Sequence, residues 1–401
     1  QYCEKVFTLS DKVIRSVSDE RPLPRIPTSV MFKASLALFW ARLGSLNALE
    51  SCSSARLWRK WLGQSLCSAD TLGRVHARMD VEGLRKGLHW VYRCLKRNKT
   101  LRGIGGWDIA VLDGHETHSS YRRHCGGCLH RTVHTEAGDR TQYYHRHVTL
   151  MLLADKLRVL LDMEPQRPGE NEVATARRLL ERVLVTYPRA FQVLLGDALY
   201  AEAPFINFLW SHQKHVLIVF KDDRRDLYRD ALALCALQGS EAGQYRGRKC
   251  KWWDVKDLTS WPQVTPPIRM VRSRETYFVR RQATGELEQQ TSNWMWVTTL
   301  SQAQANTDLV VRLGHSRWDI ENHGFNELVN AWHADHVYKH HPCAIEAFCL
   351  VAYLAYNLFH AFLTLNVKAQ LRRTKTESFW ACVLAAEIYQ DAVKFKVGRP
   401  P

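Results

Sequence analysis

The sequence predicts an α/β protein with a mixed central sheet and helices on its faces, and three observations support this class. Three strand-like runs follow one another at residues 107–113, 143–153 and 157–164. A helix, a strand, a short helix and a strand come next, at residues 170–187, 191–197, 202–212 and 216–221. The last of these strands is nearly devoid of polar residues, so both of its faces must be buried under helices.

Three strands followed by helix, strand, helix and strand is the element order of a ribonuclease-H-like core. Helical periodicity precedes this core over residues 28–102. After the core, the sequence breaks into short strands and loops, with strands expected at 249–258, 268–281 and 293–300. We therefore divide the chain into a helical N-terminal region, a first core part, a β-rich insertion, and a second core part with C-terminal helices and tail. Their boundaries are 1–104, 105–221, 222–300 and 301–401.

Composition narrows the class of protein. A hydrophobic content of 46% excludes intrinsic disorder, and a net charge of +16 points to a polyanionic partner. The first 30 residues lack the apolar core of a signal peptide, and the eleven scattered cysteines are typical of reduced thiols. The most apolar stretch, 343–365, contains Glu346, Asn357 and His360, so we expect a buried helix and not a membrane span. We expect a soluble, cytoplasmic protein.

Positive charge concentrates in two stretches. Residues 55–104 hold 12 Lys/Arg against 3 Asp/Glu, and residues 244–281 hold 10 against 3. Such a run on one helix is often only a solvated face, but here few acids lie close by to pair with it, and phosphate binding needs unpaired positive charge. The N-terminal region is therefore predicted to bind DNA, and double-stranded DNA is the expected partner. The candidate DNA-binding residues are Arg246, Arg248, Lys249, Lys251, Trp252, Trp253, Arg93, Lys96 and Arg97.

Tryptophans in the insertion have two interpretations. They pack a small β-domain, or one of them stacks on a base that is unstacked at a cleavage site. Strand alternation sends Trp252 and Trp253 to opposite faces, so only one of the two can belong to the core.

Three acids occupy positions typical of a metal site in this topology. Asp113 ends the first strand, Asp197 ends the fourth, and Glu321 lies on the helix after the insertion. Acids at the carboxyl ends of neighbouring strands point into one crevice. Carboxylates crowded there need cations, and two Mg²⁺ or Mn²⁺ ions would leave coordination sites for a phosphodiester. Each acid alone has a structural alternative: Asp113 and Asp197 as caps, and Glu321 as an ion pair with Arg317.

On these residues the chain resembles the DDE transposases of bacterial insertion sequences, in the group with a β-strand insertion between the second Asp and the Glu. The resemblance covers roughly residues 107–365. It implies that Asp113, Asp197 and Glu321 form the catalytic triad and bind the metal ions. It also implies a Tyr, Arg, Glu, Lys signature, in which Arg317 fits four residues before Glu321.

Two positions of that signature differ in this chain. Gly314 stands at the Tyr position and Leu328 at the Lys position. The phosphate contact of the Lys therefore needs another residue, for which the sequence offers His323, His315 or Lys339.

A Cys-x-x-Cys motif, Cys125 and Cys128, is followed by His130 and His134 on the hairpin after the first strand. The histidine spacing suits a tetrahedral structural zinc, although the long loop that normally separates the ligand pairs is missing. The alternatives are a redox-inert turn and a thiol pair that oxidises only in vitro.

The sequence as a whole predicts a transposase that binds the terminal repeats of its element, nicks there and transfers the strand to target DNA, as a dimer on the DNA. One alternative is a metal-dependent ribonuclease-H-like nuclease without strand transfer. Another is a non-catalytic, transposase-derived DNA-binding protein. The intact set of three acids opposes the second alternative.

Overall fold

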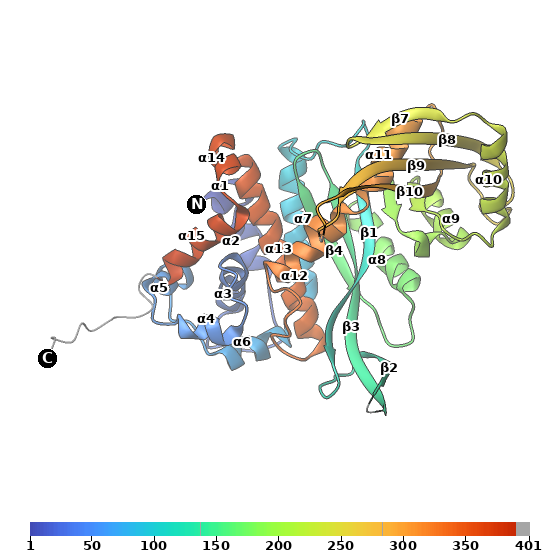
Figure 1. Cartoon of the computed structure of the whole chain (residues 1–401). Coiled ribbons are helices and arrows are strands. Elements are labelled where there is room, and N and C mark those ends of the chain that lie inside the picture. Colours follow the sequence, from blue (N-terminus) through green and yellow to red (C-terminus); the bar gives the residue numbers. More distant parts are fainter. Residues whose placement is uncertain (137, 283, 390–401) are drawn as a thin grey trace. The chain divides into compact units, whose positions relative to one another are not determined.

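The computed structural model describes residues 1–136, 138–282 and 284–389, and it forms two compact units (Figure 1). Unit 1 comprises Gln1–Arg102, Gly114–Leu179 and Asn322–Pro401, and unit 2 comprises Gly103–Asp113 and Leu180–Glu321. The chain passes from one unit to the other after Arg102, within strand β1 (Ile109–Ser120), within helix α8 (Glu172–Thr186) and within the π-helical turn η3 (Glu321–Phe325). Each unit has its own hydrophobic core.

Unit 1 combines helices with part of a sheet. Before the sheet come α1 (Tyr2–Phe7), α2 (Leu9–Lys12), η1 (Ile14–Ser16), α3 (Thr28–Trp40), α4 (Leu46–Ser51), α5 (Arg56–Leu62), α6 (Ala69–His76) and α7 (Val81–Arg97). The strands are the second half of β1 (Ile109–Ser120), β2 (Leu129–Thr135), β3 (Gly138–Leu153) and β4 (Arg158–Pro165). The C-terminal helices are α12 (Asn326–Asn330), α13 (Pro342–Leu365), α14 (Ala369–Thr374) and α15 (Glu377–Tyr389).

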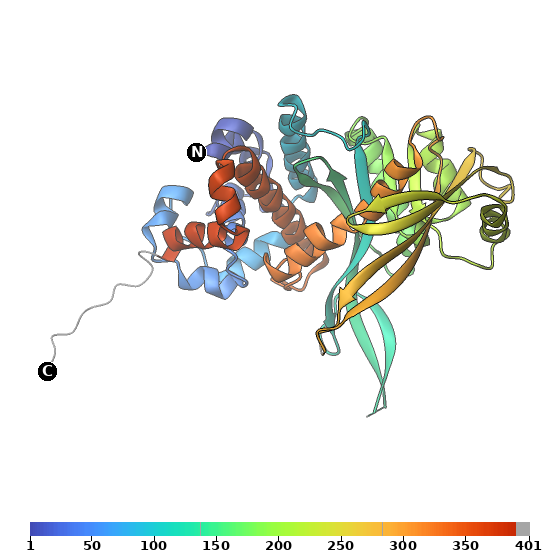
Figure 2. The same cartoon turned by 45° about the horizontal axis from the view of Figure 1, so that its top comes forward.

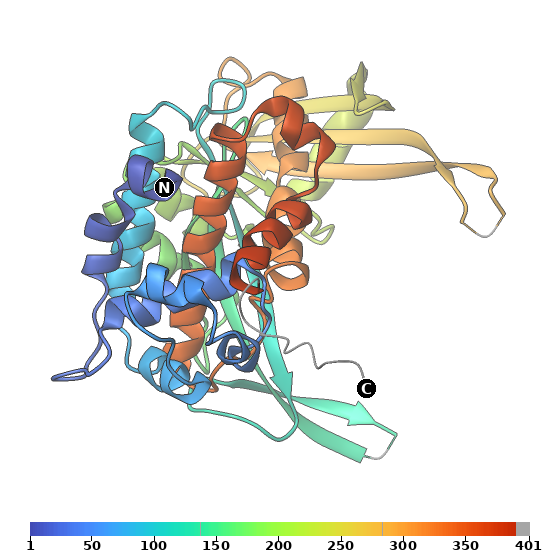
Figure 3. The same ribbon diagram turned by 90° about the vertical axis from the view of Figure 1, so that its left-hand side faces the viewer.

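Helix α13 is the centre of unit 1 and packs on α7, α3, α6 and β4 (Figure 3). It alone among the described helices is long and apolar enough to cross a membrane, yet 78% of its most apolar window is buried inside the protein. Its polar residue Asn357 is satisfied by β4, since the side chain donates to the Leu160 carbonyl and accepts from the Leu160 amide, at 2.8 and 2.9 Å. The expected buried helix is therefore confirmed.

Unit 2 is built on one mixed sheet. Its elements are the start of β1, β5 (Val193–Gly196), η2 (Ala198–Tyr200), α9 (Ala203–Ser211), β6 (His215–Val219), α10 (Asp226–Leu237), β7 (Glu241–Tyr245), β8 (Arg248–Leu258), β9 (Ile268–Arg280), β10 (Leu287–Thr298) and α11 (Thr307–Ser316). Strands β1, β5 and β6 are parallel, and β10 joins β6 in the antiparallel direction. Strands β10, β9, β8 and β7 continue as an antiparallel meander (Figure 2).

Element order and sheet confirm the predicted α/β, ribonuclease-H-like class. Helix α8 (Glu172–Thr186) precedes β5 as the order requires, and β8 and β9 begin within one residue of their predicted starts. Two elements of the insertion were not predicted, β7 and α10. Helix α10 had a readable signal, because Leu227, Ala231 and Cys235 recur every four residues and all three are buried. Helix α11 begins at Thr307, where Asn306 caps it by accepting a hydrogen bond from the Leu309 amide.

Candidate active site

Two of the three predicted acids lie on or directly after neighbouring parallel strands. In the β1–β5 ladder Val111 is the partner of Leu195, and the same sequence offset separates Asp113 from Asp197. Asp197 follows the last residue of β5, and its backbone is still extended. Asp113 does not end its strand as predicted, because β1 continues to Ser120 alongside β3. Each acid therefore follows the last residue pair of the β1–β5 ladder by two residues.

The carboxylate of Asp197 also caps the helical turn that follows it. Its Oδ1 accepts a hydrogen bond from the Leu199 amide at 2.9 Å, at the start of η2. This contact is the capping role that the sequence offered as an alternative. A cap uses one lone pair of a carboxylate, so it orients the group without occupying all of its acceptor capacity.

Arg317 contacts Asp113. Its Nη1 donates to Asp113 Oδ2 at 3.2 Å, with the two side chains only 10% and 18% exposed. The guanidinium also lies 4.4 Å from the ring centroid of Trp318, and its buried Nε lacks a hydrogen-bond partner among the described residues. The alternative pairing of Arg317 with Glu321 does not occur in the described part of the chain. Arg317 thus supplies a counter-charge to the first acid.

Glu321 is the first residue of η3 (Glu321–Phe325), a π-helical turn, and is partly buried. It follows Arg317 by four residues along a helical path, so both residues occupy the same side of that path. In the described residues, the acids Asp113, Asp197 and Glu321 do not form a group whose ligand atoms all lie within 4.8 Å of one another. Arg317 contacts the first acid, and Glu321 follows Arg317 by four residues without pairing with it in the described part of the chain.

The two signature differences have a packing explanation. A Cβ placed on Gly314 would lie 2.4 Å from Cε2 of Trp296, an indole that is 1% exposed, so no side chain fits there. Leu328 is 4% exposed and belongs to the core of unit 1. A charged lysine at that position would lose its hydration without a partner.

His315, one of the residues offered in place of the signature Lys, is already engaged. Its Nε2 lies 2.6 Å from Oε1 of Glu275 on β9, and its ring stacks on Tyr245 with centroids 4.3 Å apart. Arg248 also contacts Glu275, at 3.0 Å. The buried carboxylate thus fixes helix α11, which carries Arg317 two residues later, to the meander.

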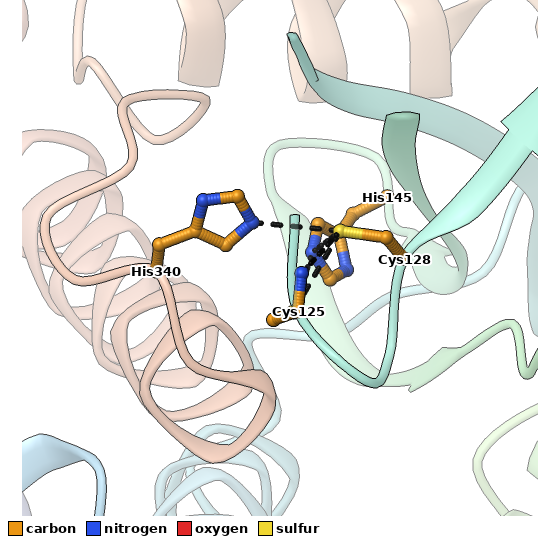
Figure 4. A group of neighbouring side chains, drawn as sticks. All are labelled: Cys125, Cys128, His145 and His340. Carbon is orange, nitrogen blue, oxygen red and sulfur yellow. Dashed lines mark hydrogen bonds between the residues drawn. The ribbon is translucent and has the colours of Figure 1, made fainter. Parts of the chain in front are cut away.

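The predicted zinc ligands are corrected by the structure. Cys125 and Cys128 group with His145 and His340, and not with His130 and His134 (Figure 4). The reason is strand register. Leu129 pairs with Tyr144 in the β2–β3 ladder, so one residue earlier Cys128 lies opposite His145. His130 and His134 are exposed along β2, and His134 pairs with Asp139 at 2.6 Å.

The basic residues of the insertion differ in their surroundings. Arg246 is exposed in the β7–β8 turn, and Lys249 and Lys251 are exposed on β8. Arg248 is held by Glu275 and by the ring of Tyr277, 4.3 Å away. The predicted DNA-binding set of the insertion therefore divides into three solvated cations and one structural arginine.

The adjacent tryptophans differ as strand alternation predicts. Trp252 is 5% exposed and covers Gly243, where an added Cβ would lie 2.3 Å from the indole. Trp253 is partly exposed, with the Arg272 guanidinium 4.9 Å from its ring centroid. Only Trp253 keeps a face open to solvent.

The helical N-terminal region needs one correction. Arg85, counted among its unpaired cations, is 8% exposed and forms ion pairs with Glu82, Asp162 and Glu346. It fixes α7 to β4 and α13 in the core of unit 1. The three candidates on α7 differ from it, since Arg93 and Arg97 are exposed and Lys96 is partly exposed.

His145 and His340 were the ligand candidates that sequence reasoning missed. A β-hairpin register would have placed His145 opposite Cys128, but that register depends on where the turn lies. His340 is far away in sequence and carries no local signal. Likewise, no local sequence pattern predicts that Glu275 fixes α11.

Comparison with known proteins agrees with this arrangement. A family model described as the transposase DDE domain matches residues 113–358, which is more than half of the chain and begins at the first of the three acids. A search of curated proteins finds no match. The order of the strands and the family match lead to one conclusion, that this chain belongs to the family of transposases with a DDE domain.

Proposed function

We propose that this transposase binds the terminal repeats of its own element, nicks the DNA there and joins the freed 3′-hydroxyl to target DNA. Membership of the family already makes it a transposase, and such proteins are metal-dependent enzymes whose partner is DNA. The observation that supports the finer proposal is the β1–β5 register, because Asp113 and Asp197 each follow its last residue pair by two residues.

The donor set suits the divalent ions that the family uses. Side-chain oxygens of adjacent carboxylates are the ligands that Mg²⁺ and Mn²⁺ prefer. We propose that Asp113 and Asp197 share one ion and that Glu321 completes a second site with one of them. When bound, these ions lower the pKa of the attacking hydroxyl group and stabilise the leaving oxygen.

Arg317 has a proposed positioning role. Its contact with Asp113 holds that carboxylate in one orientation, and the helical path from Arg317 to Glu321 connects the third acid to the first. The Asp197 cap fixes the second carboxylate in the same way. The protein thereby orients the acids through groups that belong to its own fold.

DNA is proposed to lie on exposed or partly exposed basic residues of both units. Those of unit 2 are on the β7–β8 hairpin, and those of unit 1 are on α7; they are Arg246, Lys249, Lys251, Arg93, Lys96 and Arg97. Contacts of this type bind phosphates without reading bases, so they hold DNA ends and target DNA alike. Trp253 is the candidate for stacking on an unpaired base, because Trp252 is buried.

The predicted four-part organisation remains a proposal as well. Residues 1–104 would form the helical DNA-binding region, 105–221 and 301–401 the two parts of the catalytic core, and 222–300 the β-rich insertion. We further propose that the protein works as a dimer on the nucleoid in the cytoplasm, with each protomer holding one end of the element.

The test is a reaction of purified protein with Mn²⁺ and linear DNA carrying the sequences that flank its coding region. We expect nicks at defined positions and joined products with a second DNA. Nicks without joined products would indicate the nuclease alternative. Binding without nicks would indicate the non-catalytic alternative, and either result would overturn the proposal.

A further inference from the structure

Four side chains of unit 1 converge at the base of the β2–β3 hairpin, away from any role proposed above (Figure 4). Cys125 and Cys128 come from the loop before β2, and His145 comes from β3. His340 comes from the segment before α13, and Figure 4 shows its ring directed at the Cys128 sulfur. Three separate segments of the chain therefore supply one compact cluster.

The distances match the edges of a zinc tetrahedron. Zn–S and Zn–N bonds of about 2.3 and 2.05 Å imply S···S and S···N edges of about 3.8 and 3.6 Å. The two sulfurs lie 3.7 Å apart, and His145 Nε2 lies 3.4 Å from Cys125 Sγ and 3.2 Å from Cys128 Sγ. His340 Nε2 lies 3.4 Å from Cys128 Sγ. Ordinary core packing does not require four ligand atoms at these separations.

The surroundings also suit a metal. Cys128 and His145 are each 8% exposed, so the cluster is shielded from water on one side. The Cys125 amide donates to Cys128 Sγ at 3.2 Å, a contact that stabilises a thiolate.

We propose that Cys125, Cys128, His145 and His340 bind one structural Zn²⁺. Both thiols lose their protons to solvent on binding, so two protons are released for each ion that enters. Four protein ligands fill the tetrahedron and leave no position for substrate, which makes the site structural and not catalytic. The ion ties the segment before α13 to the β2–β3 hairpin and closes a loop of nearly half the chain.

This inference does not depend on the proposed strand transfer. The first measurement is elemental analysis of protein purified without chelators, for which we expect about one zinc per chain. Protein that contains no zinc, and does not take it up after reduction and addition of Zn²⁺, would overturn the proposal.

A pair of variants distinguishes this cluster from the ligand set that the sequence predicted. His340→Ala should lower the zinc content at least tenfold, whereas the double variant His130→Ala and His134→Ala should keep it. The reverse pattern would place the metal on the hairpin alone and overturn our assignment. His340 is diagnostic because neither a plain turn nor a disulfide at Cys125 and Cys128 requires it.

Replacement by Co²⁺ keeps the test decisive if His340→Ala folds poorly. Wild-type protein loaded with Co²⁺ should show thiolate-to-metal charge transfer together with the intense visible bands of tetrahedral cobalt. Bands of an octahedral ion without charge transfer would exclude the two cysteines as ligands. A Cys125–Cys128 disulfide in freshly isolated protein, found by mass spectrometry together with absence of metal, would likewise refute the site.

Discussion

The acid pair of unit 2 and the Cys/His cluster of unit 1 are both built on paired strands, but the pairing has opposite direction. Asp113 and Asp197 each follow a parallel ladder by two residues, whereas Cys128 and His145 lie just beyond an antiparallel one, with Cys128 Sγ 3.2 Å from His145 Nε2. Parallel strands bring their carboxyl ends to the same edge of a sheet, so acids that follow such strands can be predicted as neighbours from the sequence. Antiparallel partners depend on the position of the turn, and a shift of one residue changes the partner.

The two sites also differ in how their charges are balanced. In unit 2, Arg317 offsets Asp113, and His315 and Arg248 surround Glu275. In unit 1 the cluster consists of thiols and imidazoles, and burial raises the pKa of Cys128 to about 11. Thiols must lose their protons when they bind a metal ion. This difference predicts different responses to substitution.

The largest effect is expected from the three acids. Asp113→Asn, Asp197→Asn and Glu321→Gln should each lower DNA cleavage at least about 1000-fold, equivalent to about 4 kcal/mol, because each removes metal-binding charge and keeps shape. DNA binding and zinc content should stay unchanged. Cleavage assays with Mn²⁺ measure the loss of DNA cleavage. Asp223→Asn, at an exposed position, is the matched control. A variant that cuts at near wild-type rate removes that residue from the site.

Glu275→Ala should destabilise the protein by about 3 kcal/mol, because it leaves His315 and Arg248 without their buried partner. Burial acts to raise the pKa of Glu275, but hydrogen bonds from His315, Arg248 and Ser273 outweigh it and lower the pKa below 4.5. A lowered pKa stabilises the fold above pH 4.5, and this contribution is lost as the pH falls through the folded-state value.

Denaturant unfolding between pH 3 and pH 7 checks this second prediction. The free energy of unfolding of the wild type should fall on acidification below about pH 4.5 more steeply than that of Glu275→Ala. Parallel curves for the two proteins would mean that this carboxylate does not carry the charge that the structure assigns to it.

Arg317→Ala should lower cleavage about 100-fold, the size of effect seen when one preorganised donor is lost from an active site. Because a cation is removed beside Asp113, the half-saturating Mn²⁺ concentration should fall or stay the same. Arg312→Ala, on the same helix with an exposed partner, is the control and should change neither quantity. A rise in the Mn²⁺ requirement would contradict a positioning role through Asp113.

Gly314→Ala tests the packing that replaces the signature tyrosine. The new Cβ would overlap the Trp296 indole, which is buried and cannot move aside, so we expect a loss of about 2 kcal/mol. Gly239→Ala, with nothing within 4 Å of the added atom, is the control. Thermal unfolding of the two variants measures the difference, and equal melting temperatures would show that α11 has room to shift.

The smallest effect is expected in the salt dependence of DNA binding. Neutralising the exposed residues Arg246, Lys249 and Lys251 together should lower the slope of log K on log salt by up to about 2.7 for duplex DNA. It should also reduce strand joining more than nicking, because the charge holds DNA ends. Arg248→Ala should lower stability with little change in slope, since Glu275 already neutralises it. An unchanged slope in the triple variant would mean that the β7–β8 hairpin has a structural role and does not contact DNA phosphates.

The sequence by itself determined the α/β class, the order of the core elements and the family. These features depend on local periodicity, which can be recognised within a short stretch of consecutive residues. It also predicted that only one of Trp252 and Trp253 could be core, because alternation is a local property.

Only the tertiary structure decided the partners of charged and metal-binding groups. The sequence counted Arg85 among the cations without a nearby acid. In the structure it is the centre of a buried ion network, because the acids that pair with it lie on β4 and α13. His340 joined the cysteines across more than half of the chain, while the nearby His130 remained on the surface. Partner choice depends on register and on packing between distant segments, and neither leaves a pattern in the neighbouring residues.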